Sequence, residues 1–413
     1  MVDREYARRH PAADDKGIAL LVALAVVAIL SVVILDFSFS VRVDMHIAAN
    51  FRDRLVALEA AKAGVNYGIS LLRQDEPMQD NLQDEWAQLT GIVLDRTDPY
   101  EVAEETKLEE DQAGLYNHEE FVAAQKDGSV PTATIFICDE ERKINVNRIP
   151  STLTAANQAP LPIFREWVET LLENMGLPQV DPYELVDNIA DWIDTDDDGD
   201  AEYTYYETLP QPYSCRNDRM ESIYELKMVR GMTDLVFFGN APYPMQLSGL
   251  EEDQWEKRGR LGYTMPELAP WETQQSPDAI YGLVNFLTAH SSGRINLLTA
   301  PREVMLAVLN NDDFLTDTII NAREENPQQA REIQTMIAQV APALSQVLTR
   351  AGAITYQSSY FRIESTGKFH KTAVKVIAIV SRDNARDLTV HYWRVEGARQ
   401  DDSSQDVAWV NAI

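Results

Sequence analysis

The chain has 413 residues; 45% of them are hydrophobic, and 66 Asp and Glu residues outnumber 36 Lys and Arg residues to give a formal net charge of −30. This length allows two or three domains, and the apolar content excludes a chain that is disordered throughout. Because nucleic-acid binding relies on basic patches that release counterions, the negative charge argues against DNA or RNA as a partner.

The N-terminal sequence predicts a polar leader followed by a membrane-spanning helix. Residues 1–17 are polar and mixed in charge, and an uncharged apolar run extends from Ile18 to Leu35. A run of this length is just enough to cross the hydrocarbon core of a bilayer as a helix. A secretory signal peptide would have a small-residue cleavage site after its apolar core, whereas here the small residue, Gly17, precedes the core.

Helical patterning continues past the apolar run. From Ile47 to Leu72, apolar residues recur with the period of a helix, which places them on one face. No proline interrupts the sequence between Ile18 and Glu76, and Pro77 then ends the segment. The sequence therefore predicts one continuous helix over residues 18–75, half in the membrane and half above it.

The leader ending in Lys16-Gly17, the apolar run and the amphipathic continuation resemble the class III signal of type IV pilin-like proteins. Among these the sequence is most similar to pseudopilin K, a minor pseudopilin of type II secretion systems. The resemblance implies that a prepilin peptidase cuts after Gly17 and that Ile18 is then N-methylated. Most pilins carry Glu at the fifth position after the cut; Val22 stands there in this chain, and pseudopilin K is the member that lacks this Glu.

Val22 also has a physical interpretation. A carboxylate in lipid is costly unless it meets a cation. In pilin-like filaments the Glu of an incoming subunit is held to pair with the N-terminal ammonium of the subunit assembled before it. A subunit with nothing above it has no ammonium to neutralise, so Val22 suits a tip subunit. The plainer alternative is a membrane anchor without any role in assembly.

Beyond the helix, the sequence predicts strands, then a helical block, then strands again. The acidic stretch 76–128 is expected to be loop-like. Strands are predicted at Thr132–Cys138 and Lys143–Asn147, and again at Tyr360–Lys368, Thr372–Ser381 and Leu388–Glu396. Helical stretches are predicted at Ile163–Met175, Pro182–Asp194, Ser222–Gly231, Val304–Leu309 and Ala330–Leu348.

This order predicts an α+β fold, in which a long N-terminal pilin helix packs on an antiparallel sheet that is interrupted by a large inserted all-α domain. The predicted segments are the leader 1–17, the helix 18–75, the first part of the β-region 76–150, the inserted helical domain with its acidic loop 151–345, the second part of the β-region 346–396, and a polar, loose tail 397–413. The resemblance to pseudopilin K implies such an insertion as well.

Two short motifs support the resemblance within the later part of the chain. Lys143–Asn147 (KINVN) and Gly293–Pro301 (GRINLLTAP) are similar to stretches that the family repeats. Both also resemble pieces of helix-hairpin-helix modules, which often bind DNA. The strongly negative charge argues against that use, and such a module can serve a structural role alone.

An acidic loop is the one candidate metal site. Asp194–Asp200 reads DTDDDGD, so carboxylates at Asp194, Asp196 and Asp198 precede the turn residue Gly199, and Asp200 can offer a backbone carbonyl. Tyr205 stands where the closing Glu of an EF-hand would be. Closure could come instead from Glu202, Glu207, Asp218 or Asp191. Calcium is the expected cofactor, as the family resemblance also implies, and Glu202 completes the candidate set; the alternative is a solvated acidic loop.

The remaining candidates give no indication of an enzyme. Cys138 and Cys215 are the two cysteines and lie in no CxxC zinc motif; a disulfide between them is possible if the domain lies outside the cytoplasm. A polar turn explains the sequence His290-Ser-Ser better than a catalytic nucleophile does, since no GxSxG motif is present. We therefore expect no catalysed reaction.

The resemblance implies a structural role in secretion. The chain would be a single-pass inner-membrane protein with its C-terminal domain in the periplasm. It would cap the tip of the pseudopilus and nucleate its assembly, with other minor pseudopilins, the major pseudopilin and prepilin peptidase as partners. One alternative is a minor pilin of a type IV pilus involved in assembly or adhesion. A membrane-anchored, calcium-dependent hydrolase is another, which the missing catalytic pattern disfavours.

Overall fold

The computed structural model describes residues 15–75, 79–87, 90–94, 128–149, 163–177, 180–195, 205–239, 281–325, 330–384 and 387–400. Its internal contacts divide the chain into two units, Met1–Leu55 and Val56–Ile413. The first unit is the N-terminal part of one long helix. The second contains a sheet, the end of that helix and a helical region.

Helix α1 runs without a break from Asp15 to Gln74, as the sequence predicted for residues 18–75. It is long and apolar enough to cross a membrane, with a mean hydropathy of 2.9 over its most apolar window, which is not buried by protein. Towards its C-terminal end the pattern changes, and Ala57, Ala61, Val65 and Leu72 are buried. One half of α1 is thus a candidate membrane span, and the other half is part of the folded domain.

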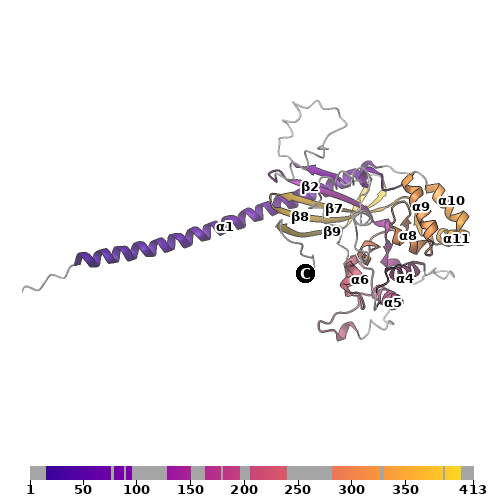
Figure 1. Cartoon of the computed structure of the whole chain (residues 1–413), viewed down its shortest axis with the longest axis horizontal. Helices are drawn as coiled ribbons and strands as arrows, with labels where there is room; N and C mark the ends of the chain where they lie inside the picture. The colour runs from indigo at the N-terminus through magenta and orange to yellow at the C-terminus, as the bar shows by residue number, and fades with distance from the viewer. Residues whose placement is uncertain are drawn as a thin grey trace, which may run out of the picture. The chain divides into compact units, whose positions relative to one another are not determined.

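The main sheet has five antiparallel strands in the order β1-β2-β7-β8-β9 (Figure 1). The strands are β1 (Thr90–Val93), β2 (Thr132–Asp139), β7 (Tyr360–Phe369), β8 (Thr372–Asn384) and β9 (Asp387–Gln400). Their β-branched and aromatic residues suit a pleated, half-buried surface. β2 pairs with β7 although more than two hundred residues separate them. The helical region is therefore an insertion in the sequence between two neighbouring strands of one sheet.

Glycines let the C-terminal half of α1 lie directly on the sheet. A Cβ at Gly367 on β7 would overlap the backbone of Ala57 and Ala61 on α1, and one at Gly64 would overlap the hydroxyl of Ser365. The core between α1 and the sheet includes Val65, Ile135, Ile363 and Ala378 among others. The predicted fold class, a long helix packed on an antiparallel sheet, is confirmed.

A second core lies in the helical region, where α4, α5, α6 and α8 to α11 gather (Figure 1). The α-helices are α4 (Ile163–Met175), α5 (Pro182–Ile193), α6 (Asp234–Phe238), α8 (Arg302–Val308), α9 (Asp313–Glu325), α10 (Ala330–Val340) and α11 (Pro342–Ala351). Short 3₁₀ helices lie at Glu85–Ala87, Glu140–Arg142, Val146–Arg148, Tyr206–Thr208, Ile223–Met228 and Leu283–Asn285. Amphipathic α4 and α5 bury their apolar faces here, including Trp167 and Trp192.

Two very short parallel strand pairs tie the helical region together. β3 (Ile144–Asn145) pairs with β4 (Leu287–Thr288), and β5 (Ile295–Asn296) pairs with β6 (Ile354–Thr355). Each pair joins segments that are distant in the sequence. They fix the entry and exit of the helical region next to the main sheet.

The structure differs from the sequence predictions at several elements. Strand β1 lies in the stretch expected to be loop-like, and its pairing with β2 gives four residues a partner that composition cannot reveal. Helix α9 was not predicted, because its sequence is largely polar and it buries few side chains. The helix predicted at Ala330–Leu348 is two helices, since Pro342 begins α11. Strand β9 extends to Gln400, four residues into the predicted tail.

Candidate functional site

The first candidate site is the exposed apolar surface of α1. Nearly every large apolar side chain from Leu20 to Leu55 is exposed, including those that lie beyond the predicted membrane span, such as Phe37, Phe39 and Phe51. A contiguous apolar surface of this extent indicates contact with lipid or with other protein helices. Gly17 and Ile18, the predicted processing residues, lie within α1, and the fold does not test cleavage between them.

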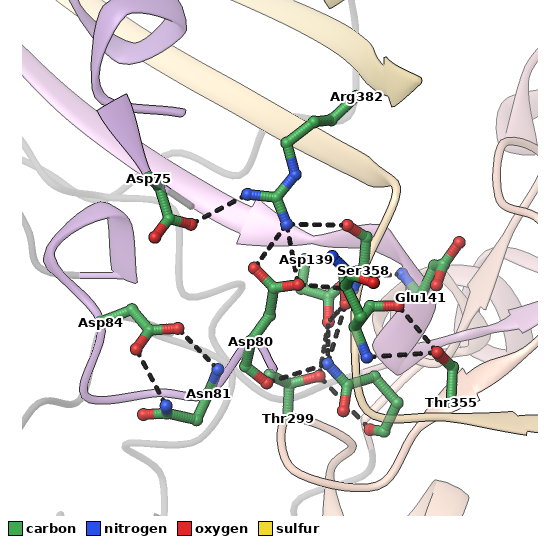
Figure 2. Close-up of polar contacts among 12 residues, drawn as sticks. Asp75, Asp80, Asn81, Asp84, Asp139, Glu141, Thr299, Thr355, Ser358 and Arg382 are labelled. Carbon is green, nitrogen blue, oxygen red and sulfur yellow. Dashed lines mark hydrogen bonds and ion pairs between the residues drawn. The ribbon is translucent and has the colours of Figure 1, made fainter. Parts of the chain in front are cut away.

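The second candidate site is a cluster that we call the buried polar joint, which connects the end of α1 to the sheet and to the helical region (Figure 2). Its members are buried or nearly buried polar side chains from five segments: Asp75, Asp80, Asp139, Asn296, Thr299, Ser358 and Arg382. Asp75 and Asp80 follow α1, Asp139 ends β2, and Arg382 lies near the end of β8. Buried polar groups persist when they are mutually hydrogen-bonded, and this cluster meets that requirement.

Arg382 is the cation at the centre of the joint. Its Nη2 lies 2.6 and 2.8 Å from the two carboxylate oxygens of Asp80, and its Nη1 lies 2.9 Å from Oδ2 of Asp75. Nη2 also donates to the backbone carbonyl of Ser358 at 3.0 Å. The guanidinium stacks over the ring of Phe361 at 4.8 Å, which fills the space on its apolar side. One side chain of β8 therefore binds two of the acidic residues that follow α1, Asp75 and Asp80.

Asp139 is the acceptor at the other end of the joint. Its Oδ2 accepts hydrogen bonds from the hydroxyls of Ser358 and Thr299, each at 2.6 Å, and from the Asn296 amide at 3.2 Å. Its Oδ1 accepts from the backbone N–H of Glu141 at 2.7 Å and so caps the turn that leaves β2. Asp139 therefore links strand β2 to the loops at the entry and exit of the helical region.

The joint contains more negative than positive charge. Burial raises the pKa of Asp80 to about 7, even though Arg382 and the Ser358 N–H favour its ionised form. Burial likewise raises the pKa of Asp139 and of Asp75, against the hydrogen bonds from Ser358 and Arg382 respectively. Asp75 and Asp80 share one guanidinium and Asp139 lies beside Asp80, so burial leaves at least one of the three carboxyls holding a proton more readily than an exposed carboxyl does.

A separate chain of buried charges crosses the sheet close to the joint. Glu140 is 3.0 Å from Arg362 and 3.8 Å from Lys143, while Glu364 is 2.5 Å from Lys375 and 3.3 Å from Arg362. Burial opposes ionisation of the two glutamates, but the neighbouring cations outweigh it and hold the pKa of both below the ordinary value. These pairs are charged and complementary, as buried ion pairs must be to persist.

A small cavity lies beside these buried ion pairs, between the sheet and the helical region. It has a volume of about 40 Å³ and is lined by residues that include Tyr224, His290, Arg362, Tyr392 and Arg394. Arg394 stacks over the ring of Tyr224 at 4.6 Å. A cavity of this size holds a water molecule and is far below the volume of an ordinary ligand pocket. It does not indicate a substrate site.

The two short motifs noted in the sequence have the same local geometry. In the first, the Asn145 carbonyl oxygen Oδ1 accepts from the Asn147 N–H at 2.9 Å; in the second, Oδ1 of Asn296 accepts from the Leu298 N–H at 3.0 Å. Each Asn therefore caps the turn that follows a two-residue parallel strand. The side-chain amide of Asn145 donates to the carbonyl of Ser291, whereas that of Asn296 enters the joint. The motifs are structural in both places.

The predicted calcium site lies mostly outside the described residues. Asp196, Asp198, Asp200 and Glu202 are in the stretch 196–204, and Asp194 alone is described, at the C-terminal cap of α5. Across the part of the chain that the structure describes, no group of three or more His, Cys, Asp or Glu residues is arranged to hold a metal ion. Calcium binding by this loop remains a prediction.

The two cysteines lie in different surroundings. Cys138 is buried in β2, and Cys215 is half-buried beside the core of the helical region, where its thiol donates to the carbonyl of Asp191 at 3.5 Å. Both are thiols in this structure. The suggested disulfide between Cys138 and Cys215 also remains a prediction.

The sequence did not reveal the joint. Asn296 and Thr299 belong to a motif that was recognised, but their partners are scattered over the chain. Arg382 gave the clearest available signal, because it stands two residues after Val380, the end of the apolar run of β8, where a charged side chain needs a partner. Nothing in the sequence indicates that this partner is Asp80, since only the pairing of β2, β7 and β8 brings the two together.

Comparison with known proteins agrees with this fold. Residues 142–243 match the first-domain family model of type II secretion system protein K. Type II secretion system protein K of Aeromonas hydrophila is 26% identical over 234 residues, which are 55% of this chain and 62% of that protein. The match thus spans less than two thirds of the relative's length.

A solved structure shares the architecture. It is a chain of the GspK-GspI-GspJ complex of the enterotoxigenic Escherichia coli type 2 secretion system, with a TM-score of 0.52 and 13% identity over 85% of this chain and 99% of that chain. At this identity the likeness concerns the fold alone. Taken together, a family model, a curated relative and a shared fold confirm the resemblance of this chain to protein K of type II secretion systems.

Proposed function

We propose that this chain is a minor pseudopilin of a type II secretion system, which caps the tip of the periplasmic pseudopilus and nucleates its assembly with other minor pseudopilins. Protein export across the outer membrane would depend on that assembly. The observation that carries the proposal is the division of α1: its first part exposes apolar side chains from Leu20 to Leu55, and its second part is packed into the sheet.

An exposed apolar helix suits assembly in and above a membrane. Leu20 to Leu35 can lie in lipid, and the apolar residues that follow, such as Phe37, Val43 and Phe51, can pack against helices of neighbouring subunits. A plain anchor would need only the first of these surfaces. The additional apolar residues therefore support an assembly role over simple anchoring.

The buried polar joint supports the transmission of force through the domain. Asp75 and Asp80 lie directly after α1, and Arg382 holds both against the end of β8. A push on α1 would therefore reach the sheet through hydrogen-bonded, buried groups rather than through a loose linker. A subunit at the tip of a growing filament requires such stiffness.

Position and partners complete the proposal. Val22 supports the tip position, for the electrostatic reason given above. The structural relative was solved as a complex named for GspK, GspI and GspJ, which supports other minor pseudopilins as partners. The proposed setting is the inner membrane, with the folded domain in the periplasm, and the proposed processing is prepilin peptidase cleavage after Gly17. The alternative of a type IV minor pilin has no comparable support.

The first test is co-expression with a prepilin peptidase, followed by intact mass measurement and N-terminal sequencing. A chain that begins at N-methylated Ile18 is expected, and a Gly17→Asp variant should stay unprocessed. A chain that keeps its leader would overturn the assembly role.

The second test is complementation of a strain that lacks this chain. We expect Val22→Glu to reduce secretion, because the new carboxylate has no ammonium partner at the tip, whereas Val26→Leu should be neutral. Equal secretion by both variants would argue against the tip position. Loss of surface piliation, with secretion intact, would favour the type IV pilus alternative.

A further inference from the structure

Helix α1 covers only part of its face of the sheet. A Cβ placed at Gly64 or Gly68 of α1 would meet side chains of β2 and β7, among them Ile135 and Ile363. The helix therefore lies over these two strands. The next strand, β8, contributes three buried residues to the same core, and β9 follows β8 as the last strand in the sheet order.

Strand β9 carries an apolar strip on the face that α1 covers in part. Val390, Trp393 and Val395 are 46%, 43% and 45% exposed. Cross-strand neighbours share a face, so these residues lie on the face of the three β8 core residues that stand opposite them. Those core residues are, in the same order, Val380, Ala378 and Val376. We call Val390, Trp393 and Val395 the β9 strip.

The other face of β9 is already occupied by the helical region. The ring of Tyr392 lies 5.9 Å from that of His290, and Arg394 stacks over the ring of Tyr224 at 4.6 Å. These contacts hold the strand in place. The β9 strip is therefore a fixed apolar surface, and a partner that binds it does not have to order it first.

The irregular register of β9 favours a partner on its face over a strand added to its edge. The β8–β9 register shifts after Ala373, after Ile379 and after Arg382. Such irregularities bend and twist a strand, and natural proteins use them to prevent pairing along an edge. A strand added at the edge would also leave the face of the strip uncovered.

One flank of α1 points towards β9. Tyr67 lies close enough to Glu85 for its charge to raise the Tyr67 pKa, in addition to the larger effect of burial, and Glu85 belongs to the 3₁₀ helix that leads into β1. Leu58 lies about two and a half turns before Tyr67 and Ile69 about half a turn after it, so both are on the opposite flank. Since β1 and β9 are the two edges of the sheet, this flank faces β8 and β9. Both side chains are partly buried at the rim of the core.

We propose that an apolar α-helix of a neighbouring pseudopilin subunit docks on the β9 strip, side by side with α1. Neighbouring strands are about 4.8 Å apart, so the line between β8 and β9 is about 10 Å from the line between β2 and β7. Packed helices have their axes about 8–10 Å apart. A second helix packed against α1 would therefore lie over β8 and β9. This inference rests on the proposed function, which supplies the neighbouring subunits.

Chemistry and continuity select this occupant. The β9 strip and the flank of α1 with Leu58 and Ile69 are apolar, so they fit a helix with an apolar face. Leu58 lies three residues after Leu55, where the exposed apolar surface already assigned to helix contacts ends. The new surface continues that one along α1, so one partner helix can use both. Trp393 is at the middle of the strip, and a Trp in such a place typically contributes a large share of the binding energy.

The test is site-specific photocross-linking of the full chain in cells that carry the complete secretion system, with p-benzoylphenylalanine in place of Trp393. The same probe in place of Phe51 reports on the exposed surface of α1. In place of Thr389, which is exposed on the opposite face of β9, it serves as the control. Mass spectrometry identifies the cross-linked peptides. We expect the probe at Trp393 to capture the N-terminal helix of another pseudopilin, and the probe at Thr389 not to capture it.

Binding of the subunit identified in this way is then measured by co-purification with the detergent-solubilised full chain. Trp393→Ser with Val395→Ser should lower the amount recovered about tenfold. Trp393→Phe, which keeps an aromatic ring, should retain most of it, and Thr389→Ser should change nothing. An unchanged thermal unfolding curve shows that each variant is folded.

The two probes separate the failure of this inference from the failure of the proposed function. Cross-links from Phe51 without any from Trp393 would leave the assembly role intact and overturn the docking site. Absence of cross-links from both positions would overturn the assembly role and the docking site with it. Capture of lipid, of a second copy of this chain or of a partner's strand by the probe at Trp393 would each overturn the helix as the occupant, and so would equal co-purification by the parent chain and the double variant.

Discussion

Both carboxylate oxygens of Asp80 lie within 2.6 and 2.8 Å of Nη2 of Arg382, in a site where the Asp80 side chain is fully buried. The two residues are 302 positions apart in the sequence. Their pairing joins the segment that follows α1 to the last residues of β8, and both side chains also hydrogen-bond the backbone of Ser358. This contact connects the helix that we assign to assembly with the rest of the folded domain.

Removing Asp80 should destabilise the domain strongly. Breaking a buried ion pair typically costs about 3–5 kcal/mol of stability. Because Asp75 still binds Arg382, Asp80→Ala should lower the free energy of unfolding by about 3 kcal/mol. Urea unfolding at pH 8 measures this difference. The control is Asp313→Ala, which breaks an exposed pair with Arg302 and should cost no more than about 1 kcal/mol. If both variants lost the same free energy of unfolding, the buried pair of Asp80 and Arg382 would stabilise the fold no more than an exposed ion pair does.

Stability should decrease as the pH rises from 5 to 7. Burial raises the pKa of Asp80 and of Glu141 to about 7, so the folded state holds these protons more tightly than the unfolded state. The stabilising contribution of such a group is complete below its unfolded pKa and is lost as the pH rises through its folded pKa. Each group contributes at most about 1.4 kcal/mol per pH unit.

The Glu141→Gln variant tests the origin of this slope. Urea unfolding at half-unit intervals from pH 5 to 8 should show a shallower dependence for the variant than for the parent chain. The pKa of Glu140 and of Glu364 is lowered, so their contribution to the slope has the opposite sign and is confined to the lower end of this range, near the ordinary pKa of Glu. Glu324→Gln, at an exposed position, should leave the slope unchanged. An identical slope in all three chains would contradict the assignment.

The contact between α1 and the sheet should tolerate no side chain at Gly367. Its Cβ would overlap backbone atoms of Ala57 and Ala61, which cannot move without displacing α1. Overpacking of this kind typically costs about 1–3 kcal/mol, and backbone overlap places Gly367→Ala at the upper end. Thermal unfolding should show a matching drop in Tm, while Asn66→Ala, at an exposed position on α1, should change Tm little. An unchanged Tm for Gly367→Ala would contradict the packing.

The regular parts of this fold were predictable because their signals are local. The helix Ile163–Met175 and the strands beginning at Tyr360 and Thr372 begin where their periodicity and composition indicate. The joint was not predictable, because its members are ordinary polar residues until the sheet brings them together. β1 and α9 were missed for a related reason: long-range pairing forms the first, and few buried side chains mark the second.

Calcium removal is the test of the acidic loop. If Asp194, Asp196 and Asp198 hold calcium, the ion stabilises the folded state by mass action, by about 2.7 kcal/mol at a hundredfold excess over its Kd. A chelator should then lower Tm by several degrees, and calcium should restore it while magnesium, which demands a tighter octahedral site, should not.

Asp196→Asn with Asp198→Asn should abolish the calcium response. The same variant should have a higher Tm than the parent chain when chelator is present, because fewer carboxylates then repel one another. The matched control is Glu109→Gln with Glu110→Gln, which removes the same charge from another acidic stretch and should keep the response. A chain whose Tm ignores both chelator and calcium would reduce the loop to a solvated acidic turn.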